Sequence, residues 1–355
     1  AGFISLLILV KKYDTDTKDI NPSCEKKEEL VMKRTVYGLI ISMVLFWFAS
    51  VSFAGIPGAT DKVTAATLLV PFFEVGVDST THPHDTLLVL WSVGGSAKIH
   101  YHVWDVDGNA VAVYGNEDLV ATGSWNTSMR GLLGSASSAV KTALTDSTGN
   151  YYRGFVTIDV VTADTDLSPL ETGYPLGTNN RLEGWIYYVR IAEGSSNSMA
   201  MIPIEEVGTS VNTYLRGFYG SDGREEIDND ARACAAKLAS GESCSNQDNI
   251  SSIRSRVFLD DSSLNASTRI IIFLWKPGTT EGLSPWCEGA GSCAATYTYN
   301  RYNESGVRVQ QDTTFRIDHV VNVVDVSGTA NGFVSIVNIP AGKNDWQAYA
   351  FSITT

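Results

Sequence analysis

The chain has 355 residues, 44% of them hydrophobic, which allows one large or two medium domains with an ample core. It carries 39 acidic and 26 basic residues, a formal net charge of −13, and a protein this acidic repels the phosphate backbone of nucleic acids. We therefore exclude nucleic acid as a partner. Solubility accounts for the negative charge, with cation binding as the alternative.

A secretory signal peptide is predicted at residues 32–54. Two basic residues follow Met32, an apolar run of ten residues extends from Leu39 to Phe48, and small residues lie three and one positions before a cut after Ala54. A transmembrane helix needs about 20 apolar residues. We therefore expect a secreted, periplasmic or extracellular protein that begins near Gly55 and has no membrane span after cleavage.

Residues 1–31 precede this signal peptide. Their Lys27-Glu28-Glu29 can be encoded by a purine-rich run that resembles a bacterial ribosome-binding site, a few nucleotides before the Met32 codon. We interpret residues 1–31 as translated upstream DNA, and a disordered polar leader is the alternative.

Strand patterns begin at Ala65. Period-two alternation and short apolar runs predict strands at Ala65–Val77, Asp85–Val93, Lys98–Val106, Ala110–Tyr114, Tyr151–Val161, Glu183–Ala192 and Ser198–Val207. Turn signals at Gly94-Gly95-Ser96 and Asp107-Gly108 predict that the second, third and fourth of these strands are consecutive hairpins. Pro71 predicts an edge or a bulge in the first strand, and Ser135–Leu144 has the pattern of a short helix.

The second half of the chain repeats this order. The most specific match is GFVTI at Gly154–Ile158, which recurs as GFVSI at Gly332–Ile336. Four further matches occur in the same order: Leu90-Trp91 with Leu274-Trp275, His100–Val103 with Thr296–Tyr299, Asp107-Gly108 with Ser305-Gly306, and Trp185 with Trp346. Five ordered matches predict a duplicated β unit of about 150 residues.

We therefore expect an all-β fold, a tandem or pseudo-duplicated antiparallel β-sandwich, with copy 1 at residues 55–209 and copy 2 at residues 210–355. Copy 2 contains an acidic insertion at residues 220–249, in which Asp228 or Asn229 can cap a short helix that ends near Gly241.

The C-terminal end of copy 2 differs from that of copy 1. Copy 1 follows its Trp185 strand with another at Ser198–Val207, whereas copy 2 stops at Thr355. We therefore expect a truncated C-terminus, and a last strand that is absent by design is the alternative. The sheet would have an open edge along Trp346–Ile353, and open edges promote self-association.

Four cysteines follow the predicted cut: Cys234, Cys244, Cys287 and Cys293. An even number in an exported protein predicts disulfides. Closeness in sequence favours Cys234 with Cys244, which would tie the short helix to the loop after it, and Cys287 with Cys293. A zinc site is the alternative, but neither pair has CxxC spacing.

The segment DKVTAATLLVPFFEV, Asp61–Val75, precedes the strand that starts at Asp85-Thr86-Leu87 and a His/Val strand that ends in a Gly hairpin. This arrangement resembles a group of uncharacterised exported bacterial β-rich proteins over most of residues 61–355. The resemblance implies export and a β fold, and it carries over no catalytic or binding residue.

Histidines provide the candidate metal site. His100 and His102 lie two residues apart and point to the same face of one strand, where they could hold zinc or copper. His84 reaches that face only if the Gly94-Gly95 turn has one extra residue. Histidines that face solvent without a metal are the alternative. Asp105–Asn109 starts like a calcium loop but lacks the downstream Glu, so a type I′ hairpin turn is the preferred interpretation.

Aromatic side chains provide the candidate binding surface. Trp185 and Tyr187 share one face of their strand, and Tyr297 and Tyr299 share a face in copy 2. Planar rings stack on sugars or pack a sheet. We therefore expect an exported structural or binding module with a glycan or cell-surface partner. The alternatives are a metal-dependent or glycosidic extracellular enzyme, although no GxSxG, HExxH or phosphate-loop motif predicts a catalytic residue, and a subunit of a cell-surface assembly.

Overall fold

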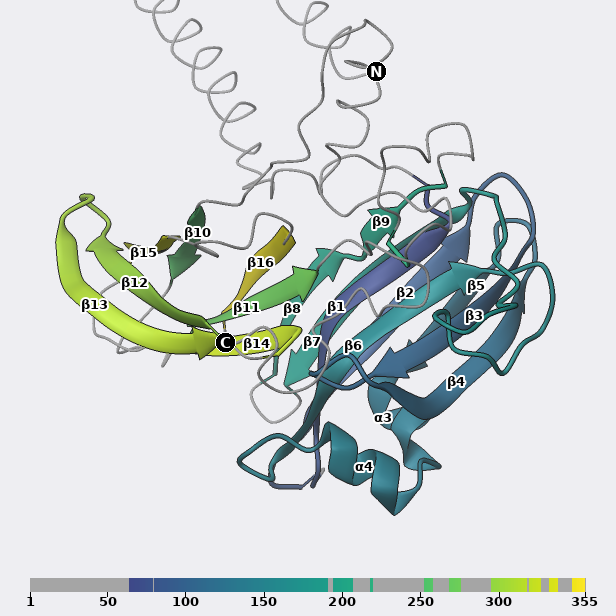
Figure 1. The fold of residues 1–355 in the computed structure, drawn as a ribbon, viewed down its shortest axis with the longest axis horizontal. Helices are drawn as coiled ribbons and strands as arrows, with labels where there is room; N and C mark the ends of the chain where they lie inside the picture. Colours follow the sequence, from purple (N-terminus) through teal and green to yellow (C-terminus); the bar gives the residue numbers. More distant parts are fainter. Residues whose placement is uncertain are drawn as a thin grey trace, which may run out of the picture. The chain divides into compact units, whose positions relative to one another are not determined.

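The computed structural model describes residues 64–78, 80–190, 194–206, 218–219, 252–257, 268–275, 295–317, 319–326, 332–337 and 347–354. These segments form four antiparallel sheets and two short helices, so the predicted all-β class is confirmed (Figure 1). The predicted signal peptide, the insertion at residues 220–249 with its helix, and the four cysteines that follow the predicted cut lie outside the described residues. Residues 56–355 form one compact unit.

The first half of the described chain contains nine strands. They are β1 (Thr67–Gly76), β2 (His84–Ser92), β3 (Ala97–Trp104), β4 (Ala110–Leu119), β5 (Ser124–Ser128), β6 (Tyr151–Val160), β7 (Leu182–Arg190), β8 (Ser195–Ala200) and β9 (Ile202–Ile204). Sheet I has the strand order β4-β3-β6-β1-β9, and sheet II has the order β5-β2-β7-β8. The inner faces of these two sheets pack together through apolar side chains such as Leu68, Leu90 and Ile186.

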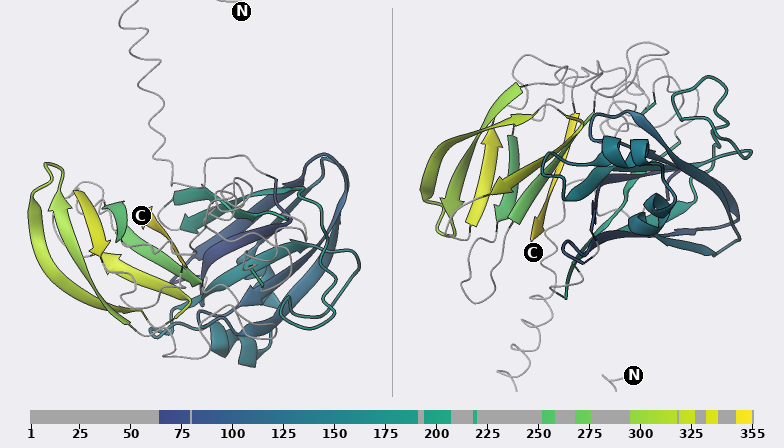
Figure 2. Two further views of the ribbon diagram at one scale, coloured as in Figure 1. Left: turned by 45° about the horizontal axis from the view of Figure 1, so that its top comes forward. Right: turned by 90° about the horizontal axis from the view of Figure 1, so that it is seen from below.

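Helices α3 (Met129–Gly134) and α4 (Ser138–Leu144) follow β5. Ser128 and Ser137 cap them by accepting hydrogen bonds from the backbone N–H groups of Gly131 and Val140, respectively. Met129 and Leu144 are buried, so the helices close one end of the first-half sandwich, which faces the reader in the right view of Figure 2.

The second half contains β10 (Ser252–Val257), β11 (Thr268–Trp275), β12 (Ala295–Asn303), β13 (Arg308–Ile317), β14 (Val321–Val326), β15 (Gly332–Val337) and β16 (Gln347–Thr354). Sheet III has the order β10-β15-β12-β13, and sheet IV has the order β14-β11-β16. Read from β13, sheet III repeats the order β4-β3-β6-β1 with every label raised by nine. Sheet IV repeats β5-β2-β7 in the same way.

Three features of the strands bear on the predictions. A register shift between Val70 and Phe73 places a bulge at Pro71, as expected. The predicted hairpin at Gly94-Gly95-Ser96 is wrong, because β2 and β3 lie in different sheets and this segment crosses from one sheet to the other. At the end of sheet IV, β16 pairs with β11 alone among the described strands, whereas its counterpart β7 is also flanked by β8.

The two halves meet at the outer face of sheet I. Phe273 of β11 contacts Phe155 of β6 edge to face, with ring centroids 5.2 Å apart. Arg269 donates hydrogen bonds to both carboxylate oxygens of Glu74, at 2.6 and 3.0 Å. This bidentate pair joins β11 to β1 in a fixed orientation.

Glu74 is only 4% exposed and has two further partners. Arg153 donates to its Oε2 at 2.9 Å, and His84 Nδ1 lies 3.2 Å from its Oε1. Burial alone raises the pKa of Glu74, but the hydrogen bonds from His84 and Arg269, with the charges of Arg269 and Arg153, lower it well below its ordinary value. The carboxylate is therefore ionised and fully engaged in the folded protein.

We predict that Arg269→Ala lowers the free energy of unfolding by roughly 3 kcal/mol, because removing one partner leaves a buried charge undercompensated. Lys98→Ala is the matched control, since Lys98 pairs with Asp118 and Asp164, which are themselves largely exposed. Its effect should be much smaller. Denaturant unfolding followed by circular dichroism measures both, and equal effects would contradict the structural role of the buried pair.

Acid should act on the same carboxylate. The folded pKa of Glu74 is depressed, so below about pH 4.3 the unfolded chain takes up a proton that the folded protein does not, and stability falls as the pH drops. Glu74→Gln should lose this part of the acid sensitivity while being less stable at pH 7. Denaturation midpoints between pH 7 and pH 3 would show a shallower slope below pH 4.3 in the variant; parallel curves would contradict the assignment.

Candidate functional site

The outer face of sheet II carries two exposed aromatic rings. Along β7, the side chains of Ile186 and Tyr188 point into the core, whereas Trp185 and Tyr187 are 40% and 36% exposed. This alternation is the period-two geometry of a strand with one buried face. The structure therefore brings Trp185 and Tyr187 together on one solvent-facing surface, as their spacing predicts.

Three side chains of β2 extend this surface. Leu87 lies opposite Tyr187, Val89 opposite Trp185, and Trp91 opposite Glu183. All three are half-buried. The indole N–H of Trp91 donates to the Glu183 carboxylate at 3.2 Å, which fixes the ring. We call the set of Leu87, Val89, Trp91, Trp185 and Tyr187 the aromatic face.

Polar side chains border the aromatic face on both sides. Asn126 of β5 lies opposite Val89, and Ser198 of β8 lies opposite Tyr187, and both are exposed. The result is a surface with aromatic rings at its centre and hydroxyl, amide and carboxylate groups at its edges. Such a surface can stack on a planar ligand or pack against another protein.

The aromatic residues of the second half behave differently. Tyr299 is 2% exposed and its ring belongs to the core, so its prediction as a ligand-binding residue is wrong: on β12, the face that carries Tyr299 is an inner face. The side chain of Tyr297 lies outside the described residues.

His100 and His102 lie on the outer face of sheet I. Their ring centroids are 6.0 Å apart, so the structure brings them together as predicted. The alternative of solvent-facing histidines is wrong, because the two residues are 0% and 3% exposed. His100 Nδ1 lies 3.1 Å from Asn116 Oδ1, whereas His100 Nε2 and both ring nitrogens of His102 have no hydrogen-bond partner among the described residues.

Burial determines the charge of both rings. It lowers the pKa of His102 to about 4, with a further contribution from the neighbouring His100. It also lowers the pKa of His100, against opposing effects of Asn116 and Asp159. Both imidazoles are therefore neutral at pH 7, the form that binds metal ions.

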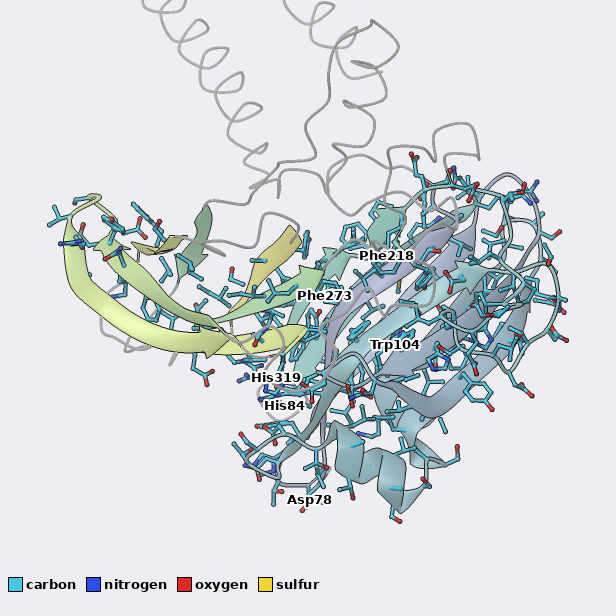
Figure 3. The ribbon with its side chains drawn as sticks, viewed as in Figure 1. Asp78, His84, Trp104, Phe218, Phe273 and His319 are labelled. Atoms are coloured by element: carbon cyan, nitrogen blue, oxygen red, sulfur yellow. The ribbon has the colours of Figure 1, made fainter. Side chains whose placement is uncertain are left out.

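His84 does not join this pair. It starts β2 in sheet II, beside Glu74 and stacked on Tyr151, away from Trp104, which neighbours His102 on β3 (Figure 3). Its prediction as a third ligand depended on a β2–β3 hairpin that does not form. Within the described segments, no group of three or more His, Cys, Asp or Glu side chains is placed to hold a metal ion. The zinc or copper site at His100 and His102 stays a prediction.

The candidate calcium loop is a hairpin turn. The Asp105 carboxylate accepts hydrogen bonds from the backbone N–H groups of Asp107 and Asn109, both at 2.9 Å, and Gly108 has a φ of 83°. This is the bonding that closes a turn, and it engages the carboxylate. Asp107 instead faces the second half, where its Oδ1 lies 2.6 Å from His319 Nδ1.

One polar residue of this region was missed at the sequence level. Asp159 of β6 lies directly opposite His100, is fully buried, and accepts hydrogen bonds from the hydroxyls of Thr67, Tyr174 and Tyr219. A carboxylate within the apolar strand VTIDVV was the available signal. The outer face of sheet I therefore carries a buried polar cluster next to the contact between the two halves.

Comparison with known proteins does not identify a family for this chain. No protein-family model and no curated protein matches this chain. No helix among the described residues is long and apolar enough to cross a membrane.

We predict that His102 makes the protein sensitive to mild acid. Its folded pKa lies below that of a free histidine, so between about pH 6.5 and pH 4 the unfolded chain binds a proton that the folded protein does not. Stability should fall by up to about 3 kcal/mol as the pH drops through this range. His102→Phe should remove that slope, and His82→Phe, the control at a less buried histidine, should keep it. Denaturation midpoints across pH 7 to pH 4 test this, and unchanged slopes in His102→Phe would contradict it.

Proposed function

We propose that this protein is an exported binding module that makes its contacts through the aromatic face of sheet II. The observation that carries the proposal is the exposure of Trp185 and Tyr187, which are 40% and 36% exposed on the same face of one strand. Large aromatic side chains on a surface are costly to hydrate and are enriched where proteins bind ligands or one another. Export rests on the predicted signal peptide at residues 32–54.

A glycan is the first class of ligand to test. Sugar rings have flat apolar faces that stack on Trp and Tyr, and their hydroxyls need polar partners at the edge of the stack. Asn126, Glu183 and Ser198 stand at those edges. The second class of ligand is a protein surface, as in a cell-surface assembly. The apolar side chains of Leu87 and Val89 on β2 favour this class, because they can pack against apolar side chains of a protein partner.

The double variant Trp185→Ala/Tyr187→Ala should weaken contacts made by this face at least tenfold, since central aromatic residues dominate binding energy. Its thermal melting should change little, because both rings point to solvent. Binding to a panel of insoluble polysaccharides and self-association in sedimentation velocity are the two readouts.

The matched control is Val120→Ala/Leu167→Ala, which removes exposed apolar side chains elsewhere on the surface. It should bind as the unmodified protein does. If the aromatic variant equals this control in both readouts, the aromatic face is not a contact surface.

A further inference from the structure

The aromatic face has a counterpart in the second half of the chain. In sheet II, Leu87 pairs with Tyr187 and Val89 with Trp185. In sheet IV, at the equivalent positions of β11 and β16, Ile271 pairs with Phe351 and Phe273 with Tyr349. In both sheets, two apolar side chains of one strand therefore lie opposite two aromatic side chains of the neighbouring strand.

The counterpart in sheet IV is covered. Ile271 and Phe273 are fully buried and Phe351 is 6% exposed. Phe273 packs on Phe155, and Phe351 stacks on Tyr188 with ring centroids 6.1 Å apart. The molecule itself thus shows what covers this face, namely the outer face of sheet I around Phe155 together with Tyr188 of sheet II.

That receiving surface also has a counterpart. On sheet I, Trp104 lies opposite Phe155 and stacks on it at 5.8 Å and 6°. On sheet III, Tyr302 lies opposite Phe333 and stacks on it at 5.3 Å and 15°.

The backbone around the two ring pairs agrees as well. Gly154 and Gly332 precede the two phenylalanines. A Cβ added to Gly154 would clash with the backbone carbonyl oxygen of Trp104, and one added to Gly332 would clash with that of Tyr302. The turns that follow share two bonds: Asn303 Oδ1 accepts from the backbone N–H groups of Ser305 and Val307, as Asp105 Oδ1 does from those of Asp107 and Asn109.

The two receiving surfaces differ in what covers them. Trp104 and Phe155 are 1% and 0% exposed, whereas Tyr302 and Phe333 are half-buried. One chain therefore makes the contact once internally and leaves one copy of each of its two faces accessible.

We propose that copies of this chain associate head to tail, with the aromatic face of sheet II in one copy packed on the Tyr302–Phe333 surface of sheet III in the next. This inference deepens the proposed function and rests on it, since it names the partner of the aromatic face. The contact joins two different surfaces, so it is heterologous and need not close, and association can continue beyond a dimer.

Intermolecular contact should be weaker than the contact within the chain. Asp85 occupies the position of Arg269, and its carboxylate already accepts hydrogen bonds from the backbone N–H groups of Thr86 and Arg130. The bidentate pair with Glu74 is thus not repeated between copies. Association by apolar packing alone is expected to be reversible and dependent on concentration.

Complementing variants test the proposal. The variant Trp185→Arg/Tyr187→Arg disrupts the aromatic face of sheet II. Tyr302→Arg and, separately, Phe333→Arg disrupt the Tyr302–Phe333 surface of sheet III. The unmodified protein should show a weight-average mass in sedimentation velocity that rises with concentration past that of a dimer. Each variant alone should associate at least tenfold more weakly, whereas an equimolar mixture of the two kinds should form a dimer and stop there, because one intact face remains on each.

Three outcomes would overturn the inference: an unmodified protein that stays monomeric at all concentrations, association that persists in the variants, as pairing through the β16 edge would produce, or a mixture of folded variants that stays monomeric. Circular dichroism melts establish folding. If both Tyr302→Arg and Phe333→Arg unfold the protein, hydrogen exchange in the unmodified protein decides. Peptides that contain Trp185 and Phe333 should both gain protection as the protein concentration rises, and no gain in protection would refute the contact. Loss of polysaccharide binding in the Trp185/Tyr187 variant without any association would leave the proposed function standing and remove a second copy as the partner.

Discussion

The contact between the two halves depends on one buried carboxylate. Glu74 holds Arg269 of β11, Arg153 of β6 and His84 of β2, so a single side chain ties together sheets I, II and IV. A charge in this position is stable only with all its partners, which fixes the place of β11 on the outer face of sheet I more strictly than apolar packing would. Phe273 then meets Phe155 as a consequence of that placement.

The same placement explains why equivalent residues have different roles. Ile271 and Phe351 are core residues because sheet IV has a sheet to pack on, whereas Leu87 and Tyr187 at the matching positions of sheet II face solvent. Likewise Trp104 and Phe155 are fully covered, whereas Tyr302 and Phe333 are only half-buried. The strand order β4-β3-β6-β1 of sheet I recurs as β13-β12-β15-β10 in sheet III, which supports the proposal of a duplicated unit. In such a unit, one copy of each contact surface is used inside the chain, and the second copy of each stays accessible.

The polar cluster on sheet I lies beside this interface. A row of rings runs from His102 to Trp104, Phe155 and Phe273, with centroids 4.9, 5.8 and 5.2 Å apart. Neutral, buried imidazoles at one end of this row and an ionised Glu74 near the other give the first half two distinct sensitivities to acid. Both reside on the face of the sheet that an isolated sandwich would expose.

The sequence predicted features that depend on neighbouring residues, and it missed those that depend on contacts between distant parts of the chain. Alternation within a strand is local, so most strands of the first half, the bulge at Pro71 and the shared faces of Trp185 with Tyr187 and of His100 with His102 were predictable. The short strand β5 was not predicted, and the single strand predicted at Ser198–Val207 is divided between β8 of sheet II and β9 of sheet I. The partner strand is not local: Gly94-Gly95 suits a hairpin, yet the chain crosses there to another sheet and leaves His84 beside Glu74. The sequence comparison matched His100 with Thr296, whereas the strand pairing matches it with Thr298: His100 lies opposite Asp159 of β6, and Thr298 lies opposite the equivalent Val337 of β15. A shift of two residues keeps the same side chains on the same face, so the alternation in the sequence could not reveal this error. Burial of Tyr299, His100 and Asp159 depends on what covers each face, which tertiary packing alone decides.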